Sequence, residues 1–261
     1  MRTVLQKRKE KLGYTYEEIA DKADLPLEMV VDYFEEKISS LGYVSIRAIN
    51  HVLFPDEEAD KICEPEPAYK VHMEKKQGEY TVDDYLAWPE DQRIELIDGV
   101  IYDMAAPTEI HQIVSFEVGY VLRNYIHDKK GLCIPIASPI DVQLDMNDKT
   151  MVQPDVLVLC DRSKFKYGRI YGAPDFVAEV LSPSTRKKDM IKKLSKYQAA
   201  GVKEYWIVDL QEKKVIVYSN MTPESKVIMI YPFESEVPVG IYNGECVVDF
   251  KEIDKYVSFL Y

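Results

Sequence analysis

The sequence lacks the features that mark a membrane protein or an exported protein. No run of eighteen or more apolar residues occurs, so no segment is expected to cross a membrane as a helix. The N-terminal stretch from Met1 to Arg8 is charged and has no long apolar segment behind it, so we do not expect it to be a secretory signal. We therefore expect a cytoplasmic protein without a membrane partner.

Cysteine is scarce, and its spacing argues against two common uses. The four cysteines are far apart and none forms a CxxC pair, so a structural zinc site is not expected. A disulfide framework is unusual in a chain of this length. Reduced thiols in a cytosol are therefore the simplest account of Cys63, Cys133, Cys160 and Cys246.

An excess of positive charge is also absent, because the formal net charge is −12. An acidic surface is common in soluble enzymes and argues against a protein that coats nucleic acid through bulk charge. A local basic groove stays compatible with this composition, since phosphate binding depends on local potential. The hydrophobic fraction of 46% indicates a globular protein with a core, built as one large domain or as a small and a medium one.

Residues 1–63 have the pattern of a small all-α domain. Thr15 followed by Glu18 predicts a capped helix start, and the segment 24–26 predicts a turn before a second helix at 27–37. A further helix is expected over about 45–53. This layout resembles the helix-turn-helix of phage-repressor-like regulators.

The would-be recognition helix of this segment is acidic. Residues 28–36 carry four acids and no base, and residues 1–63 hold nine Lys and Arg against thirteen Asp and Glu. Because phosphate contacts are made by cations, a module for dimerisation or partner contact is favoured over one that reads DNA. A homodimer is one arrangement that the sequence leaves open.

A proline-containing segment at 64–79 predicts a linker, and a larger domain follows at 80–261. Helical and strand patterns alternate there, which indicates an α/β fold. Asp98-Gly99 is a strong hairpin signal between two strands, and Thr108 can cap a long helix that reaches Asp128. Other expected elements are strands at 134–144, 151–160 and 176–181, a helix at 184–200, a hairpin at 205–218, and short strands after 226.

Two of these strands each carry one carboxylate in an almost wholly apolar run, Asp155 in 154–160 and Glu179 in 176–181. Such strands are buried on both faces, where an ionised acid is costly unless it is paired. A divalent cation between the two carboxylates would offset both charges, and Mg²⁺ is typically held by one or two carboxylates. The alternative for each acid is compensation by backbone N–H groups or by a lysine.

The segment after Glu179 reverses the acidic balance of the chain. Lys188, Lys192 and Lys196 are spaced four apart and would form one cationic ridge on an α-helix. A neighbouring stripe places Lys193 at the boundary between the core and the site. An ordinary solvated helix face is the alternative. Against the single acid Asp189, the cations of this segment are Arg186, Lys187, Lys188, Lys192, Lys193 and Lys196.

Several separated motifs, in order along the chain, carry a resemblance to a known family. From about Tyr80 to the C-terminus the sequence resembles the Uma-two family of restriction-endonuclease-type proteins, within the PD-(D/E)XK nuclease superfamily. The motifs are Arg93–Tyr102, Met104–Gln112, Pro154–Val156, Ala178–Thr185, and Asp189, Lys193 and Tyr197 followed by Gly201–Asp209.

The resemblance implies a restriction-endonuclease-like central mixed sheet flanked by helices, with a Mg²⁺-dependent phosphodiesterase site. Asp155 matches the first acidic element and Glu179 the second. The lysine expected two positions on is Leu181 in this chain, and Lys193 on the following helix is the natural replacement.

Four further residues are candidates for the site. Glu95 matches an early acidic position and would make a third contact with metal or water, although a cross-strand pair with Arg93 or a lysine explains it equally well. His111 would orient a phosphate or water, or it packs under a loop. Gln153 and Tyr197 would line the site.

These expectations combine into metal-dependent endonuclease-type hydrolysis of nucleic acid, with DNA as the expected substrate. Asp155 and Glu179 hold Mg²⁺ (or Mn²⁺), and Lys193 steadies the developing negative charge. Arg186, Lys187, Lys188, Lys192 and Lys196 would track phosphates. Competing interpretations are a catalytically idle relative that binds nucleic acid or a partner protein, a repressor-like regulator, and a hydrolase of smaller phosphodiesters.

Overall fold

The computed structural model divides the chain into two compact units, Met1–Tyr102 and Asp103–Tyr261. It describes residues 2–38, 41, 43–54, 75–89, 92–104, 106–144, 148–166, 168–182, 188–222 and 226–260. Most of the predicted linker, residues 64–74, lies outside the described residues, as do Arg186 and Lys187. The predicted domain boundaries at 63 and 80 therefore stay a prediction.

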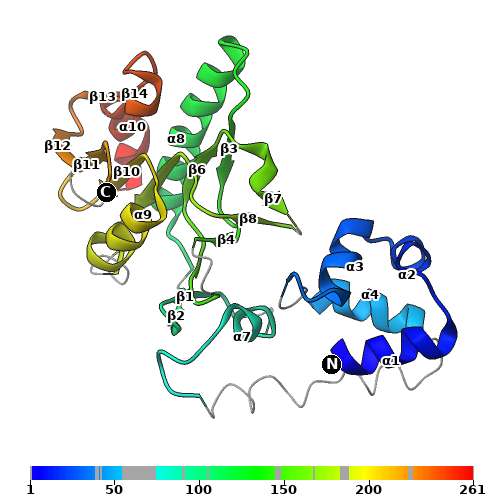
Figure 1. Cartoon of the computed structure of the whole chain (residues 1–261). Helices are drawn as coiled ribbons and strands as arrows, with labels where there is room; N and C mark the ends of the chain where they lie inside the picture. The colour runs from blue at the N-terminus through cyan, green and yellow to red at the C-terminus, as the bar shows by residue number, and fades with distance from the viewer. Residues whose placement is uncertain are drawn as a thin grey trace. The chain divides into compact units, whose positions relative to one another are not determined.

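The first unit begins with four helices, α1 (Arg2–Leu12), α2 (Tyr16–Ala23), α3 (Leu27–Phe34) and α4 (Tyr43–Leu53) (Figure 1). Helix α2 packs on α3 and α4, and α1 packs on α4 around the buried residues Leu5, Ile19 and Ile49. The capping box predicted at the start of α2 is confirmed, because Thr15 Oγ1 accepts from Glu18 N while Glu18 Oε2 accepts from Thr15 N. Local sequence therefore fixes where this helix begins.

The same unit holds a short helix and a hairpin, α7 (Val82–Leu86), β1 (Ile94–Ile97) and β2 (Val100–Asp103). Asp98 and Gly99 join the strands with φ of 52° and 73°, so the predicted turn is confirmed. Both positions need the left-handed region, which glycine adopts at little cost. A Cβ at Gly99 would also lie 2.4 Å from Gly78 O, so both the positive φ and the lack of space require glycine at this position.

The second unit is built on a mixed sheet whose strands follow the order β12-β11-β10-β9-β6-β3 (Figure 1). Strands β9 and β10 are parallel, and the other neighbouring pairs of this sheet are antiparallel. The parallel pair needs a crossover, which the helical segment between those strands supplies. The strands are β3 (Ile134–Ala137), β6 (Val156–Leu159), β9 (Phe176–Val180), β10 (Glu204–Asp209), β11 (Lys214–Ser219) and β12 (Val227–Pro232).

Helices cover both faces of this sheet. On one face α8 (Glu109–Asp128) and α10 (Phe250–Val257) pack with even-numbered strand residues such as Val156, Ala178 and Trp206. On the other face α9 (Leu194–Ala200) brings Tyr197 against Tyr205, with ring centroids 4.9 Å apart. Because side chains of a strand alternate between faces, the odd-numbered acids Asp155 and Glu179 belong to the α9 side.

The Thr108 cap of α8 and the hairpin of β10 and β11 are confirmed. Two strand predictions need correction. The expected strand at 134–144 is two strands, β3 and β4 (Val142–Gln143), and 151–160 is split into β5 (Met151–Val152) and β6. Pro139 and Pro154 lie at the interruptions, and proline has no N–H for a ladder. Helix α10, whose cap is Asp249, was not predicted.

A second set of strands follows the order β5-β4-β8-β7, with β7 (Phe165–Lys166) and β8 (Arg169–Tyr171). Strands β13 (Glu236–Pro238) and β14 (Val247–Asp249) form a separate pair. One-turn 3₁₀ segments lie at Arg162–Lys164, Gly240–Tyr242 and Ser258–Leu260.

The helix expected at 184–200 is a π-helix, η2 (Lys188–Lys193), that continues into α9. A π-turn holds more residues than an α-turn, so this segment is not the α-helix that the sequence predicts, and the cationic ridge of Lys188, Lys192 and Lys196 stays a prediction. Lys192 is exposed, Lys196 is half-buried and Lys193 is buried. The side chain of Lys188 lies outside the described residues.

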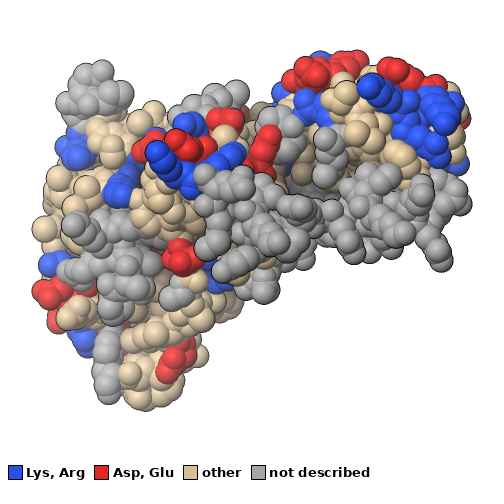
Figure 2. Space-filling model, turned by 90° about the horizontal axis from the view of Figure 1, so that it is seen from below, with Lys and Arg blue, Asp and Glu red and all other residues tan. Residues whose placement is uncertain are grey.

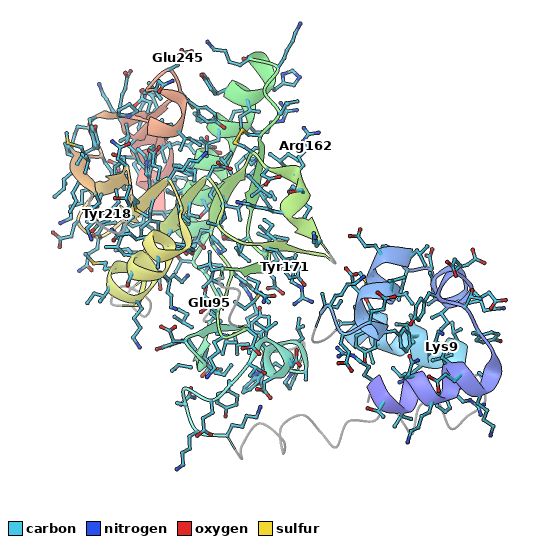
Figure 3. The ribbon with its side chains drawn as sticks, viewed as in Figure 1. Lys9, Glu95, Arg162, Tyr171, Tyr218 and Glu245 are labelled. Atoms are coloured by element: carbon cyan, nitrogen blue, oxygen red, sulfur yellow. A yellow bond between two sulfur atoms is a disulfide. The ribbon has the colours of Figure 1, made fainter. Side chains whose placement is uncertain are left out.

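The expectation that the cysteines are all reduced is wrong, because Cys133 and Cys160 form a disulfide (Figure 3). Strands β3 and β6 are antiparallel with Ile134 opposite Leu159. Continuing that register by one residue places Cys133 opposite Cys160. The pairing arises from strand register, which cysteine spacing alone does not reveal. Cys246 is a buried free thiol.

Charged side chains do not segregate by sign on the face drawn in Figure 2, where basic and acidic residues are interspersed. Within the described ranges, no helix combines the length and the apolar character needed to cross a bilayer.

Candidate active site at the junction of two strands

The site begins with the register of β6 and β9. Val156 pairs with Ala178 in antiparallel orientation, and one further step along both strands brings Asp155 opposite Glu179. Directly opposite residues of an antiparallel pair point to the same face, with Cβ atoms about 4.5–5.5 Å apart. Strand pairing therefore places the two predicted acids together at the start of β6 and the end of β9.

The two oxygens of Asp155 have different surroundings. Oδ2 accepts from the backbone N–H of Val180 at 2.8 Å and lies 3.2 Å from Nε2 of His111. Within the described part of the chain, no hydrogen bond or ion pair involves Oδ1. The side chain is 16% exposed. One oxygen thus fixes the carboxylate, and the other is available to a ligand.

Glu179 lies in a more enclosed setting, with its side chain 3% exposed. Its Oε1 accepts from Lys193 Nζ at 2.9 Å and from the Tyr197 hydroxyl at 2.7 Å. Lys193 and Tyr197 are four residues apart where η2 continues into α9, so both reach the same oxygen. A buried acid, a buried ammonium group and a buried phenol form one cluster.

Protein groups therefore compensate both acids. The backbone N–H of Val180 and His111 serve Asp155, and Lys193 and Tyr197 serve Glu179. A metal cation is therefore not required to stabilise these two carboxylates in the folded protein.

The donor set fits a small divalent cation. Oxygen ligands suit Mg²⁺ and Mn²⁺, and Mg²⁺ sites commonly use one or two carboxylates completed by water and phosphate. Asp155 Oδ1 supplies such an oxygen, beside the carboxylate of Glu179. Among the described residues, no group of three or more His, Cys, Asp or Glu side chains could hold a metal.

His111 lies in the first turn of α8, where Thr108 Oγ1 accepts from its backbone N–H. Burial lowers the pKa of its imidazole, but the hydrogen bond and the charge of Asp155 more than offset burial, so the pKa is raised above 6.5. Its Nδ1 is buried and has no hydrogen-bond partner within the described ranges. The ring thus orients Asp155 through Nε2.

The other residues predicted for the site are Gln153 and Glu95. Gln153 donates through Nε2 to Asp141 Oδ1 at 3.0 Å. Glu95 is fully buried on β1 in the first unit, and its role stays a prediction (Figure 3). Asp209 stabilises the turn after β10, because its Oδ1 accepts from Glu212 N at 3.1 Å.

One contributor could not be found in the sequence. The backbone N–H of Val180 holds Asp155, and a backbone donor carries no residue signature. The contact between His111 and Asp155 joins positions 44 residues apart. The sequence predicted that His111 would orient a phosphate or water, or would pack under a loop, and not that it would contact Asp155. The fold brings both groups to the carboxylate.

The mixed sheet with helices on both faces is a nuclease-like α/β fold. A solved structure shares this fold, a "putative nuclease belonging to DUF820" from Anabaena variabilis. The match has a TM-score of 0.56 and 22% identity, and covers 68% of this chain and 98% of that one.

Residues 82–238 match the Uma2 family, described as "Putative restriction endonuclease", and the chain belongs to this family. A similar protein is the uncharacterized slr1290 of Synechocystis sp., 29% identical over 152 residues, which cover 57% of this chain and 78% of that protein.

Proposed function

We propose that this protein hydrolyses phosphodiester bonds in nucleic acid, with DNA as substrate and Mg²⁺ (or Mn²⁺) as cofactor. The observation that supports the proposal is the opposition of Asp155 and Glu179 at adjacent strand ends, with Lys193 buried against Glu179. Membership of the Uma2 family supports a nuclease activity in general. Asp155 and Glu179 would hold the ion, which when bound would lower the pKa of a coordinated water and polarise the phosphodiester.

The chain's own residues position the reacting groups. His111 and the Val180 N–H hold Oδ2 of Asp155, so Oδ1 is presented in a fixed direction. Lys193 carries a positive charge whose position is fixed by Glu179, and such a charge stabilises negative charge that develops on the phosphate. Tyr197 restrains the same carboxylate.

The cations of the neighbouring segment would contact flanking phosphates. Lys192 is exposed and Lys196 half-buried in the described part of this segment. Contacts of this kind depend on charge and not on base sequence, so they would position the backbone without selecting a sequence. Arg186, Lys187 and Lys188 are proposed to act with them, and Glu95 as a third acidic contact.

The decisive test is cleavage of linear double-stranded DNA by the full chain in Mg²⁺, in Mn²⁺ and in EDTA. We expect Asp155→Asn to lower the rate by about a hundredfold or more, since it removes charge from the proposed ion site. Asp161→Asn is the matched control, because Asp161 follows the other end of β6 and is exposed. Equal rates for both variants would contradict the site.

A second candidate function is supported by the ion pair of Lys193 with Glu179, since a permanently paired site would bind nucleic acid without cleaving it. DNA binding by the wild-type chain, with no cleavage in either metal, would establish this idle state. Where the wild type does cleave, Lys193→Met should abolish cleavage, because it removes the charge held by Glu179.

For residues 1–63 we propose a helical module that contacts a partner and does not read DNA. Acidic residues Glu28 and Asp32 on α3 support this assignment. A chain lacking residues 1–63 should keep the DNA affinity of the full chain in a gel-shift titration. A large loss of affinity would instead favour the helix-turn-helix interpretation.

A further inference from the structure

Strand β12 has an unusual surface for the last strand of a sheet. Its one strand neighbour in the described residues is β11, and it lies at the outer edge of the sheet in Figure 1. Four consecutive apolar residues are exposed, Val227 by 46%, Ile228 by 49%, Met229 by 47% and Ile230 by 62%. Natural proteins usually protect such an edge with charges, bulges or covering segments.

The backbone of β12 shows which groups face outward. Phe233 N donates to Lys213 O, so residue 233 points its backbone groups toward β11. Because this direction alternates along an antiparallel strand, Ile228 and Ile230 turn their N–H and C=O groups away from β11. Pro232 also faces away from β11, and because proline has no backbone N–H it presents only its carbonyl oxygen there. The edge therefore presents a short ladder of donors and acceptors between exposed apolar side chains.

We propose that β12 pairs in antiparallel orientation with β12 of a second copy of this chain, which joins the two sheets across a twofold axis. A twofold contact uses the same surface on both copies, and a free edge strand is complementary to itself. Backbone groups of Ile228 and Ile230 would then be satisfied between copies, while apolar side chains on both faces of the strand lose contact with water.

Charge at the strand ends favours a second copy in this orientation. β12 itself carries no charged residue, and it is flanked by Lys226 and Glu234, both exposed. Antiparallel pairing brings the Lys226 end of one copy against the Glu234 end of the other, at both ends of the contact. Parallel pairing would instead bring like charges together, which is unfavourable.

The test is sedimentation of the full chain over a wide range of concentrations. The wild type should form a dimer that dissociates on dilution. Ile230→Lys should raise the dissociation constant at least tenfold, because it places a charge on each copy at the contact. Leu132→Lys is the matched control, since Leu132 is 73% exposed and lies outside β12. A wild type that stays monomeric at the highest concentration overturns the proposal, as does equal dimerisation of Ile230→Lys.

A charge reversal tests orientation without touching the strand. Glu234→Lys should weaken the dimer, more strongly at low salt than at high salt, because like charges then meet at both ends. Adding Lys226→Glu to that variant restores opposite charges and should restore the dimer. If the double variant is weaker than Glu234→Lys alone, the antiparallel arrangement is wrong. Circular dichroism and urea unfolding of each variant confirm that the protomer is folded.

Discussion

Replacing Lys193 with methionine tests the buried cluster directly. The ammonium group lies 2.9 Å from Glu179 Oε1, and both side chains are 3% exposed. Methionine keeps much of the side-chain volume, so the main change is loss of the charge partner. Removing one member of a buried ion pair leaves an uncompensated charge and costs about 3–5 kcal/mol.

The assay is urea unfolding followed by tryptophan fluorescence, since Trp206 is buried in the core of the same sheet. With a dependence on urea of about 2–3 kcal/mol per molar, the midpoint should fall by about 1–2 M. Lys129→Met is the control, because Lys129 lies 2.8 Å from Glu245 but both side chains are more than half exposed. That exposed pair should contribute little.

Two further results decide whether the reasoning holds. A double variant, Lys193→Met with Glu179→Leu, should recover most of the lost stability, because no lone charge then stays buried. Mn²⁺ should stabilise Lys193→Met more than the wild type, since a cation would replace the missing positive charge. A midpoint for Lys193→Met that matches Lys129→Met would refute the assignment of a buried ion pair.

Three other predictions use different parts of the chain. Burial, with the charge of Glu204, raises the pKa of the Cys246 thiol to about 11, so this thiol should not react in the folded protein. In a Cys63→Ser variant, a thiol reagent should therefore detect no thiol before unfolding, one after unfolding without reductant, and three after unfolding and reduction. Three reactive thiols without reductant would contradict the disulfide. The pKa of His111 is raised above 6.5 in the folded protein, so protonation of this imidazole stabilises the fold. That stabilisation is complete below pH 6.5 and is lost as the pH rises through the pKa of the folded state. In urea unfolding, the wild type and His111→Gln should therefore differ more in stability at pH 5.5 than at pH 9. Gly99→Ala should lower stability by about 1–3 kcal/mol in thermal unfolding, since a Cβ would meet Gly78 O; an unchanged melting temperature would count against that turn.

Local signals in the sequence predicted local structure well. Thr15 and Thr108 begin their helices as capping rules predict, and Asp98-Gly99 closes its hairpin. Each of these features depends on a few adjacent residues, so no knowledge of the fold was needed. The apolar runs around Asp155 and Glu179 likewise indicated strands buried on both faces, because burial sets composition directly.

The incorrect and missing predictions have different physical causes. Apolar composition could not show that Pro154 separates two strands that pair with different neighbours. The π-helix that ends at Lys193 was missed because its residues are also good α-helix formers. The cap of α10 at Asp249 and the apolar spacing of Phe250, Ile253 and Val257 were visible signals that could have been read.

The two acids of the candidate site have different surroundings: protein groups hold Glu179, and Asp155 has one oxygen held by the backbone. Glu179 lies within a strand, and its Oε1 is held by Lys193 and Tyr197, so its charge is matched by protein. Asp155 lies just before a strand, where the backbone is free to expose one oxygen while the other accepts from Val180 N. A lysine two residues after Glu179 would extend from the same strand. In this chain the lysine, Lys193, lies instead on the helical segment that packs on the sheet, and its ammonium group reaches Glu179 from there. Tyr197, one turn later, contacts the same carboxylate. The position of this lysine would then depend on packing of α9 against the sheet, so substitutions that loosen that packing should impair the site without touching any of its residues.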